Sequence, residues 1–63
     1  MNFIELSLAR IDRKIYINPR HITSFSSFEQ EGVTVLVMDN EHEYFVKESV
    51  EQILNLIPYG GGV

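Results

Sequence analysis

The stretch Val33–Ile57, VTVLVMDNEHEYFVKESVEQILNLI, decides the fold because it holds a complete hairpin followed by a complete helix. VTVLVM is apolar or β-branched at both alternating sets of positions, which is typical of a central strand with two covered faces. The polar residues DNEH then predict a four-residue hairpin connection, and EYFV resumes the alternation as the returning strand. We therefore expect an antiparallel pair of strands at the centre of the molecule.

The end of the same stretch carries the signals of one short helix. Ser49, followed three residues later by Gln52, gives the pattern of a capping box. Pro58 stops the helix. A helix of about two turns is unstable alone in water, so we expect it to pack on the sheet. Its apolar positions fall at i, i+3, i+4 and i+7 on one face, formed by Val50, Ile53, Leu54 and Ile57.

The chain before Val33 predicts further strands. FIELSLAR (3–10) and KIYIN (14–18) both alternate and should form a hairpin. Asn18 and Pro19 are typical of the N-cap and the first position of a helical turn, which would redirect the chain. TSFSSFE (23–29) predicts a third strand with Phe25 pointing inward, and EQEG a turn into the central strand.

The predicted fold is mainly β with one C-terminal helix: a small antiparallel β-meander of four or five strands, curled or barrel-like. We expect residues 1–58 to form a single small domain and residues 59–63, which include three glycines, to be a disordered tail.

One helix can cover only one face of this sheet, so the second apolar face needs another cover. Either the meander curls into a small barrel and buries that face, or a partner covers it. Exposing several large apolar side chains together is unusual for a monomer. We predict that the second face holds the partner-interface residues, which are Leu36, Met38, Phe45 and Phe28.

Size and charge narrow the class of protein. A chain of 63 residues has a small core, and the absence of cysteine excludes disulfides and thiolate metal sites. No signal peptide or membrane span is visible, and we expect a cytoplasmic protein.

Residues 1–22 carry four basic and two acidic side chains, a sum of +2, and residues 29–51 carry one basic and seven acidic side chains, a sum of −6. The net charge of −4 argues against DNA binding, and its asymmetry favours a basic partner or a second copy.

The sequence contains no pattern typical of catalysis, cofactor binding or metal binding. His21 and His42 lie in no nucleophile or zinc motif, and Ser49 is better explained as a helix cap. DNEHE (39–43) lacks the glycine and the distal acid of a calcium loop. The glycines form no phosphate loop. We predict no catalytic residue, no cofactor and no metal, and hence no enzyme.

The order of these signals resembles a known family of short proteins encoded in bacterial flagellar operons, the FlbD type. The residues that carry the resemblance run through residues 3–57: Asn18, Ile22, Val33 to Val37, Tyr44, Val46, Glu48, Ser49 and Ile53. The sequence departs from the family pattern where Glu41, instead of glycine, follows Asn40, which implies a longer hairpin. The resemblance implies a bacterial or phage accessory protein that acts by contact, with no catalytic residues to carry over.

Three functions are therefore considered. The first is a non-catalytic protein-interaction module or accessory and regulatory protein, which binds another protein or itself as a homo-oligomer; a phage or mobile-element inhibitor of a host protein is a variant of it. The second is a small-molecule-binding or sequestering protein with a pocket lined by Tyr16, Tyr44 and Arg20, whose ligand the sequence leaves unknown. The third is RNA binding through a basic and aromatic patch comprising Arg10, Arg13, Lys14, Tyr16 and Phe3.

Overall fold

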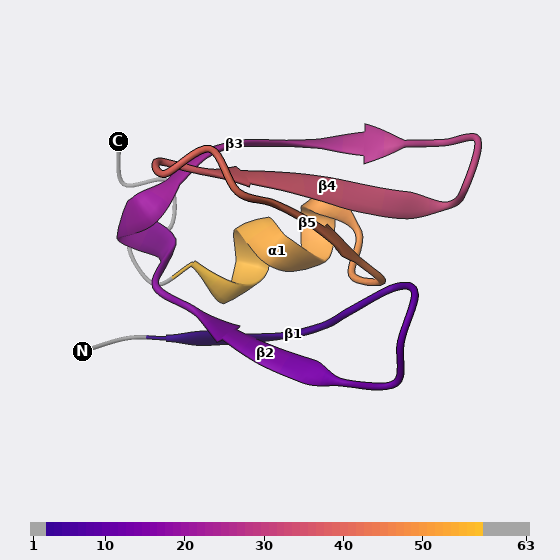
Figure 1. Cartoon of the computed structure of the whole chain (residues 1–63), viewed down its shortest axis with the longest axis horizontal. Helices are drawn as coiled ribbons and strands as arrows, with labels where there is room; N and C mark the ends of the chain where they lie inside the picture. Colours follow the sequence, from indigo (N-terminus) through magenta and orange to yellow (C-terminus); the bar gives the residue numbers. More distant parts are fainter. Residues whose placement is uncertain (1–2, 58–63) are drawn as a thin grey trace.

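The computed structural model describes residues 3–57, and in that range it contains five strands, one 3₁₀ turn and one α-helix (Figure 1). The predicted fold class, mainly β with one C-terminal helix, is confirmed. Pro58 and the predicted tail 59–63 lie outside the described residues. The elements in chain order are β1 (Ile4–Ser7), β2 (Lys14–Ile17), η1 (Pro19–His21), β3 (Ile22–Phe28), β4 (Val33–Met38), β5 (Glu43–Val46) and α1 (Val50–Leu56).

The strands form two antiparallel sheets, a β1–β2 hairpin and a three-stranded sheet in the order β3–β4–β5. The sheets meet where the chain leaving β1 runs beside the end of β5. There the Ala9 N–H donates to the Phe45 carbonyl and the Lys47 N–H donates to the Ser7 carbonyl, each over 2.8 Å. The meander is therefore curled, and the described strands do not close into a barrel.

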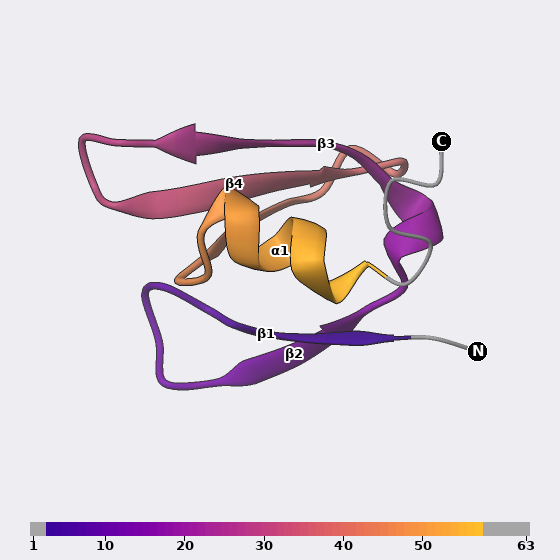
Figure 2. The ribbon, with the colours of Figure 1, turned by 180° about the vertical axis from the view of Figure 1, so that it is seen from behind.

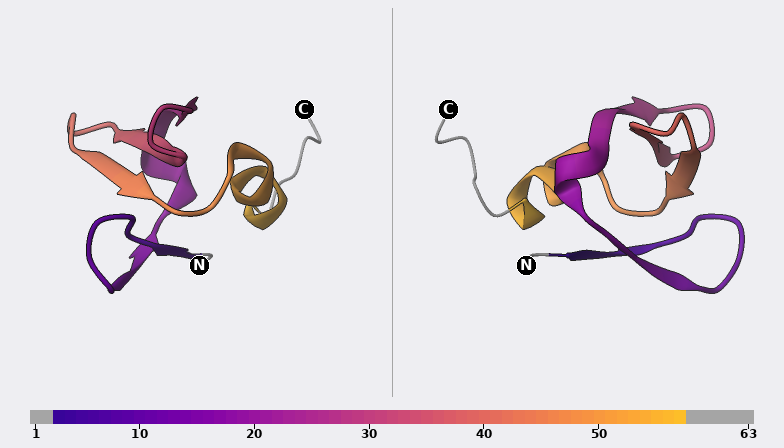
Figure 3. Two further views of the ribbon diagram at one scale, coloured as in Figure 1. Left: turned by 90° about the vertical axis from the view of Figure 1, so that its right-hand side faces the viewer. Right: turned by 60° about the vertical axis from the view of Figure 1, so that its left-hand side comes forward.

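Helix α1 packs from one side across the opening between the two sheets (Figures 2 and 3). The predicted capping box is confirmed: the Gln52 N–H donates to Ser49 Oγ (3.1 Å), and the Ser49 N–H donates to Gln52 Oε1 (2.8 Å). These bonds satisfy two of the amide groups that a helix start leaves without intrahelical partners. Asn18 likewise caps η1, because its Oδ1 accepts the Arg20 N–H over 3.0 Å.

The core lies between the helix and the inner faces of both sheets. Its members come from β1, β2, β4, β5, α1 and the residue after α1, and they are Ile4, Leu6, Ile17, Leu36, Val46, Ile53 and Ile57. The alternation predicted for β1 is confirmed, because Ile4 and Leu6 are buried while Phe3 and Glu5 are exposed. Phe25 points toward this core from β3, as expected.

Glu48, the residue before the helix cap, joins three parts of the molecule. Its carboxylate Oε1 accepts the Ser7 backbone N–H over 2.9 Å, which ties it to the end of β1. Its backbone carbonyl accepts a hydrogen bond from Thr34 Oγ1 over 2.6 Å, which ties it to β4. Thr34 is the buried polar side chain of the core, and this bond satisfies its hydroxyl. The Glu-Ser pair of the family pattern therefore has a structural role.

The two hairpin loops of the three-stranded sheet each contain a residue in the left-handed region of backbone space. Gly32 has φ 67°, which glycine adopts without a steric cost. Glu41 has φ 71° within the predicted four-residue loop between β4 and β5, where the Glu41 N–H donates to the Met38 carbonyl. The turn thus keeps a backbone conformation suited to glycine although the residue is glutamate.

Predictions of side-chain position are wrong on the helix and on β4. Leu54 was expected on the packed face of the helix, but it is 53% exposed, because α1 has only two turns and Ile53 and Ile57 make its buried contacts. Leu36 was expected on the outer side of the sheet with Phe45. It is 0% exposed and belongs to the core, because the helix covers the side of β4 that carries Thr34 and Leu36.

Candidate protein-binding face

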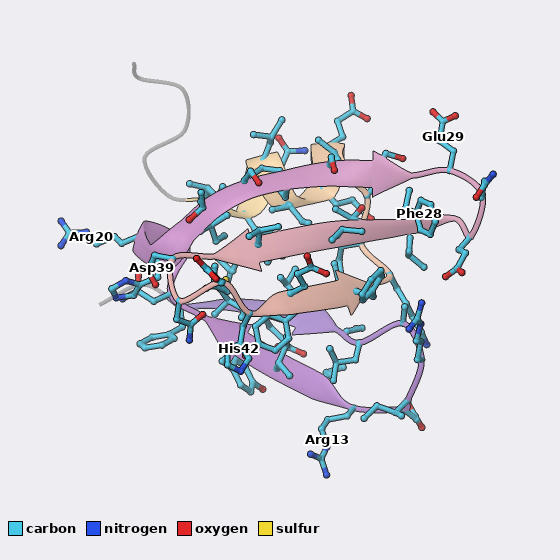
Figure 4. All side chains as sticks on the ribbon, turned by 45° about the horizontal axis from the view of Figure 1, so that its top comes forward. Arg13, Arg20, Phe28, Glu29, Asp39 and His42 are labelled. Atoms are coloured by element: carbon cyan, nitrogen blue, oxygen red, sulfur yellow. The ribbon has the colours of Figure 1, made fainter. Side chains whose placement is uncertain are left out.

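The side of the three-stranded sheet turned away from α1, which Figure 4 shows in front of the helix, carries a set of adjoining apolar residues, which we call the outer face. Three valines run along the middle of it on β4, and one phenylalanine lies beside them on each flanking strand. All five side chains are half-buried by one another and by their neighbours. The outer face comprises Phe28, Val33, Val35, Val37 and Phe45.

Strand register places these residues together. Directly opposed residues of an antiparallel pair share a face, and successive residues along a strand alternate. Phe28 pairs with Val33, and Val35 pairs with Phe45 on its other side. By the same register Leu36 pairs with Tyr44 and Phe25 on the inner side. The two faces of β4 are thus both apolar, but only the inner one has a second layer of structure over it.

Arg10 lies across the margin of the outer face, over Phe45. Its guanidinium carbon lies 4.4 Å from the centre of the Phe45 ring, a cation–π contact. The same guanidinium forms an ion pair with Glu31 over 3.2 Å. Both charged side chains stay about half exposed or more, so the pair is a rim of the face and not a lid over it.

A shallow groove opens beside Phe45, between the β1–β2 loop and the edge of β5. Its volume is ≈ 210 Å³, room for an apolar side chain or two. The groove extends the outer face around the edge of the sheet. Its lining residues are Leu8, Arg10, Ile11, Glu43, Tyr44 and Phe45.

Acidic side chains stand at both ends of the outer face. The loop that enters β4 carries Glu29 and Glu31, and Figure 4 places Glu29 beside Phe28 at that end. The opposite end carries Glu41 in the β4–β5 loop and Glu43 at the start of β5. An apolar centre with acidic ends complements a partner surface that is apolar in the middle and basic at its edges.

The four predicted interface residues lie on two different sides of the three-stranded sheet. Phe28 and Phe45 lie on the outer face, so an interface role for them stays a prediction. Met38 lies on the inner side, paired with Ile22 and packed against the core. Leu36 is fully buried and has no surface to offer a partner of the folded chain. The alternation of VTVLVM contained this division, but the sequence did not indicate which alternating set the helix covers.

The valines are the members of the outer face that sequence reasoning assigned to the wrong side. Val33, Val35 and Val37 were recognised as one face of the central strand, and the interface was placed on the other. The two sides differ at Thr34, a polar residue within the even-numbered set that is nevertheless buried. Its hydroxyl needs a partner when buried, and the carbonyl before the helix cap provides it.

Two basic residues of the candidate RNA patch form ion pairs within the chain. Lys14 forms an ion pair with Glu5 over 3.0 Å, and Arg10 is paired as described. The hydrogen bond and the negative charge of Glu5 raise the pKa of Lys14 above its ordinary value of 10.5. Of these two pairs, Arg10–Glu31 joins the basic first part of the chain to the acidic second part, so it partly offsets the charge asymmetry along the sequence.

The residues considered for metal or ligand binding are also dispersed. Asp39 Oδ2 lies 2.7 Å from His21 Nδ1, a contact between the β4–β5 loop and η1. Within residues 3–57, no three histidine, aspartate or glutamate side chains gather as a metal site would require. Of the two grooves described in that range, one includes Tyr44 and neither includes Tyr16 or Arg20. No helix in the same range is long and apolar enough to cross a membrane.

Comparison with known proteins gives a family match over most of the chain. A family model, FlbD, described as flagellar and swarming motility proteins, matches residues 6–59. The chain belongs to the FlbD family. The match begins within β1, at Leu6, and runs past the end of α1, so the three strands that carry the outer face lie inside it. Searches of curated proteins and of solved structures found no match.

Proposed function

We propose that this FlbD-family chain is a non-catalytic accessory protein of flagellar or swarming motility, and that it acts by binding another protein through the outer face. The observation that carries the proposal is the contiguous apolar surface of five side chains on three adjacent strands, which no second layer of the described chain covers. Apolar side chains exposed singly are ordinary, whereas a contiguous set marks an interaction surface.

The other exposed apolar side chains support this choice of surface by their distribution. Phe3 and Tyr16 lie on the β1–β2 hairpin, and Leu54 and Leu56 lie on the helix. They are more exposed individually than the outer-face residues, but they are divided between two different elements. Ile11, in the hairpin loop, lines the groove beside Phe45 and so adjoins the outer face. The outer face is the surface on which apolar side chains adjoin one another through strand register.

The chemistry of the partner follows from the rim. The net charge of −4 and the glutamates at both ends of the face favour a partner that presents apolar side chains bordered by lysine or arginine. The groove beside Phe45 suits one apolar anchor residue of that partner, the usual arrangement of an interface hot spot. We infer that binding takes place in the cytoplasm. That compartment is reducing, and a chain without cysteine has no disulfide that could be reduced there.

The test is a double variant of the outer face, Val35→Thr with Val37→Thr. It is expressed in a strain of a motile organism from which the gene has been deleted. Threonine keeps the branched shape and the strand propensity of valine, so the free energy of unfolding should fall by about 1 kcal/mol or less. Swarming or swimming expansion should fall toward that of the strain without the gene. The matched control is Leu54→Gln, which makes an exposed apolar residue polar on the helix and should leave motility unchanged.

Two results would count against the proposal. Full motility with the folded double variant would show that the outer face is dispensable. Loss of motility in Leu54→Gln, with the outer-face variant active, would move the binding surface to the helix.

A further inference from the structure

Strand β3 forms an unpaired edge of the three-stranded sheet. It pairs with β4 on one side, and no strand within residues 3–57 lies on its other side. At seven residues it is the longest strand of the molecule, and Figure 1 shows it at the margin of the fold. An open strand edge offers backbone N–H and C=O groups to another strand.

This edge lacks the usual protection against pairing. Ile22–Phe28 contains no charged residue and no proline, and its one irregularity is the shift of register between Ile22 and Ser24. By contrast β2, an edge strand of the β1–β2 hairpin, is four residues long and begins with Lys14. Natural sheets shield their edges with charges, prolines, short strands or covering elements. The sequence ITSFSSF is therefore open to strand addition.

A groove runs beside the first half of this edge, between β3, η1 and the end of α1. Its volume is ≈ 400 Å³, which side chains of an added strand could occupy. The lining mixes apolar side chains with strand backbone, as in grooves that accept an extended chain. The lining residues are Pro19, Ile22, Thr23, Ser24, Phe25 and Ile57.

The opposite charges at the two ends of β3 favour antiparallel pairing with a second copy of the same strand. Arg20 precedes the strand and Glu29 follows it, and neither belongs to an ion pair among the described residues. They stand at opposite ends in Figure 4. A second β3 laid antiparallel along the edge brings the basic end of each copy to the acidic end of the other. The edge is thus complementary in charge to itself under a two-fold rotation.

We propose that two copies of this chain associate through antiparallel pairing of β3 with β3, centred at Phe25. This register uses the middle of the seven-residue strand. It sets Phe25 beside Phe25 of the partner subunit and Ser24 opposite Ser26 of the partner subunit. It also brings Arg20 near Glu29 of the partner subunit. The two three-stranded sheets become one sheet of six strands, and the two outer faces lie side by side on it.

The first experiment tests the register with cysteines placed in a chain that has none. Ser24 and Ser26 are exposed, so Ser24→Cys and Ser26→Cys should leave the fold and its circular dichroism unchanged. Opposed residues of paired strands lie within disulfide range, whereas diagonal neighbours are about 7–8 Å apart. Mild oxidation of a mixture of the two variants should give a covalent dimer. Each variant alone should give little.

The second experiment reverses the end charges and measures association by sedimentation equilibrium. Arg20→Glu and Glu29→Arg should each weaken the dimer roughly tenfold, because each places like charges at both ends of the paired strands. The double variant should restore association, since the charges are opposite again. Both side chains are exposed, so unfolding of the single variants is not expected.

Three outcomes would overturn the proposal. The unaltered chain could be monomeric at every concentration, which would leave the β3 edge free or reserved for an extended segment of a different protein. Cross-linking could be equal in the mixture and in the single variants, which would exclude this register. Restored association could fail in the charge-swap double variant. Each result is independent of motility, so it leaves the proposed outer-face function standing.

Discussion

The two faces of the three-stranded sheet carry similar apolar residues, but only the residues of the inner face belong to the core. The inner face carries Leu36 and Val46 at 0% exposure beneath the helix, with Thr34 bonded to the chain that enters the helix. The outer face carries three valines in the same strand, half-buried and bordered by Arg10. What separates the core face from the proposed binding face is therefore the second layer, and not the composition of the strand.

The largest expected effect that would sharpen this comparison is on the inner face. Leu36→Ala removes a fully buried side chain and should lower the free energy of unfolding by about 2–5 kcal/mol. A core of this size rarely supplies more than about 3–5 kcal/mol, so the variant should be largely unfolded. Urea titration followed by circular dichroism measures it. A variant as stable as the parent would show that Leu36 does not belong to the core.

Thr34→Val tests how the inner face is joined to the helix entry. The change keeps the shape of the side chain but removes the hydroxyl that donates to the Glu48 carbonyl, so it should cost about 1–3 kcal/mol. Thr23→Val, at an exposed position, is the matched control and should stay within about 0.5 kcal/mol. Equal stability of the two variants would mean that the buried bond contributes little.

Ser49→Ala tests whether the layer over the inner face depends on its cap. The reciprocal bonds between Ser49 and Gln52 start the helix, and their loss should cost about 0.5–2 kcal/mol. The variant should also lose helical circular dichroism at temperatures below its midpoint. Unchanged unfolding would place the effective start of the helix elsewhere.

These positions also indicate how far the sequence could lead. The hairpins, the Asn18 turn and the capping box follow local rules, and each was predicted from its own residues. The choice of covered face was not local, because both alternating sets of VTVLVM are apolar. It depends on Thr34 meeting the Glu48 carbonyl, 14 residues away in the chain. The contact of Arg10 with Phe45 and Glu31 is likewise a product of the curl, and no spacing in the sequence signals it.

Glu41→Gly examines the loop at the acidic end of the outer face. The left-handed backbone conformation of Glu41, at φ 71°, costs about 1–2 kcal/mol, and glycine avoids this steric cost. Glycine loses more conformational entropy on folding, which costs about 0.5–1 kcal/mol. We expect a net stabilisation of about 0.5–1 kcal/mol. Glu29→Gly, at a residue outside the left-handed region, should instead be neutral or destabilising. A destabilised Glu41→Gly variant would contradict the turn geometry.

The smallest effect concerns an exposed ion pair on the β1–β2 hairpin. Glu5 raises the pKa of Lys14, so the pair contributes stability below the ordinary lysine pKa of 10.5 and loses it as the pH rises through the higher folded-state pKa. Glu5→Gln should remove this dependence. Melting temperatures of both proteins from neutral pH to above 10.5 should converge at the alkaline end. A constant difference across that range would contradict the pairing.

The most direct test of the comparison substitutes threonine at two adjacent residues, Val35 and Leu36, and measures both unfolding and motility. Leu36→Thr should unfold the chain, because it places a hydroxyl in the core. Val35→Thr should stay folded in solution yet fail to support motility. A Val35→Thr protein that is folded and supports full motility would contradict the central claim that the outer face binds the partner.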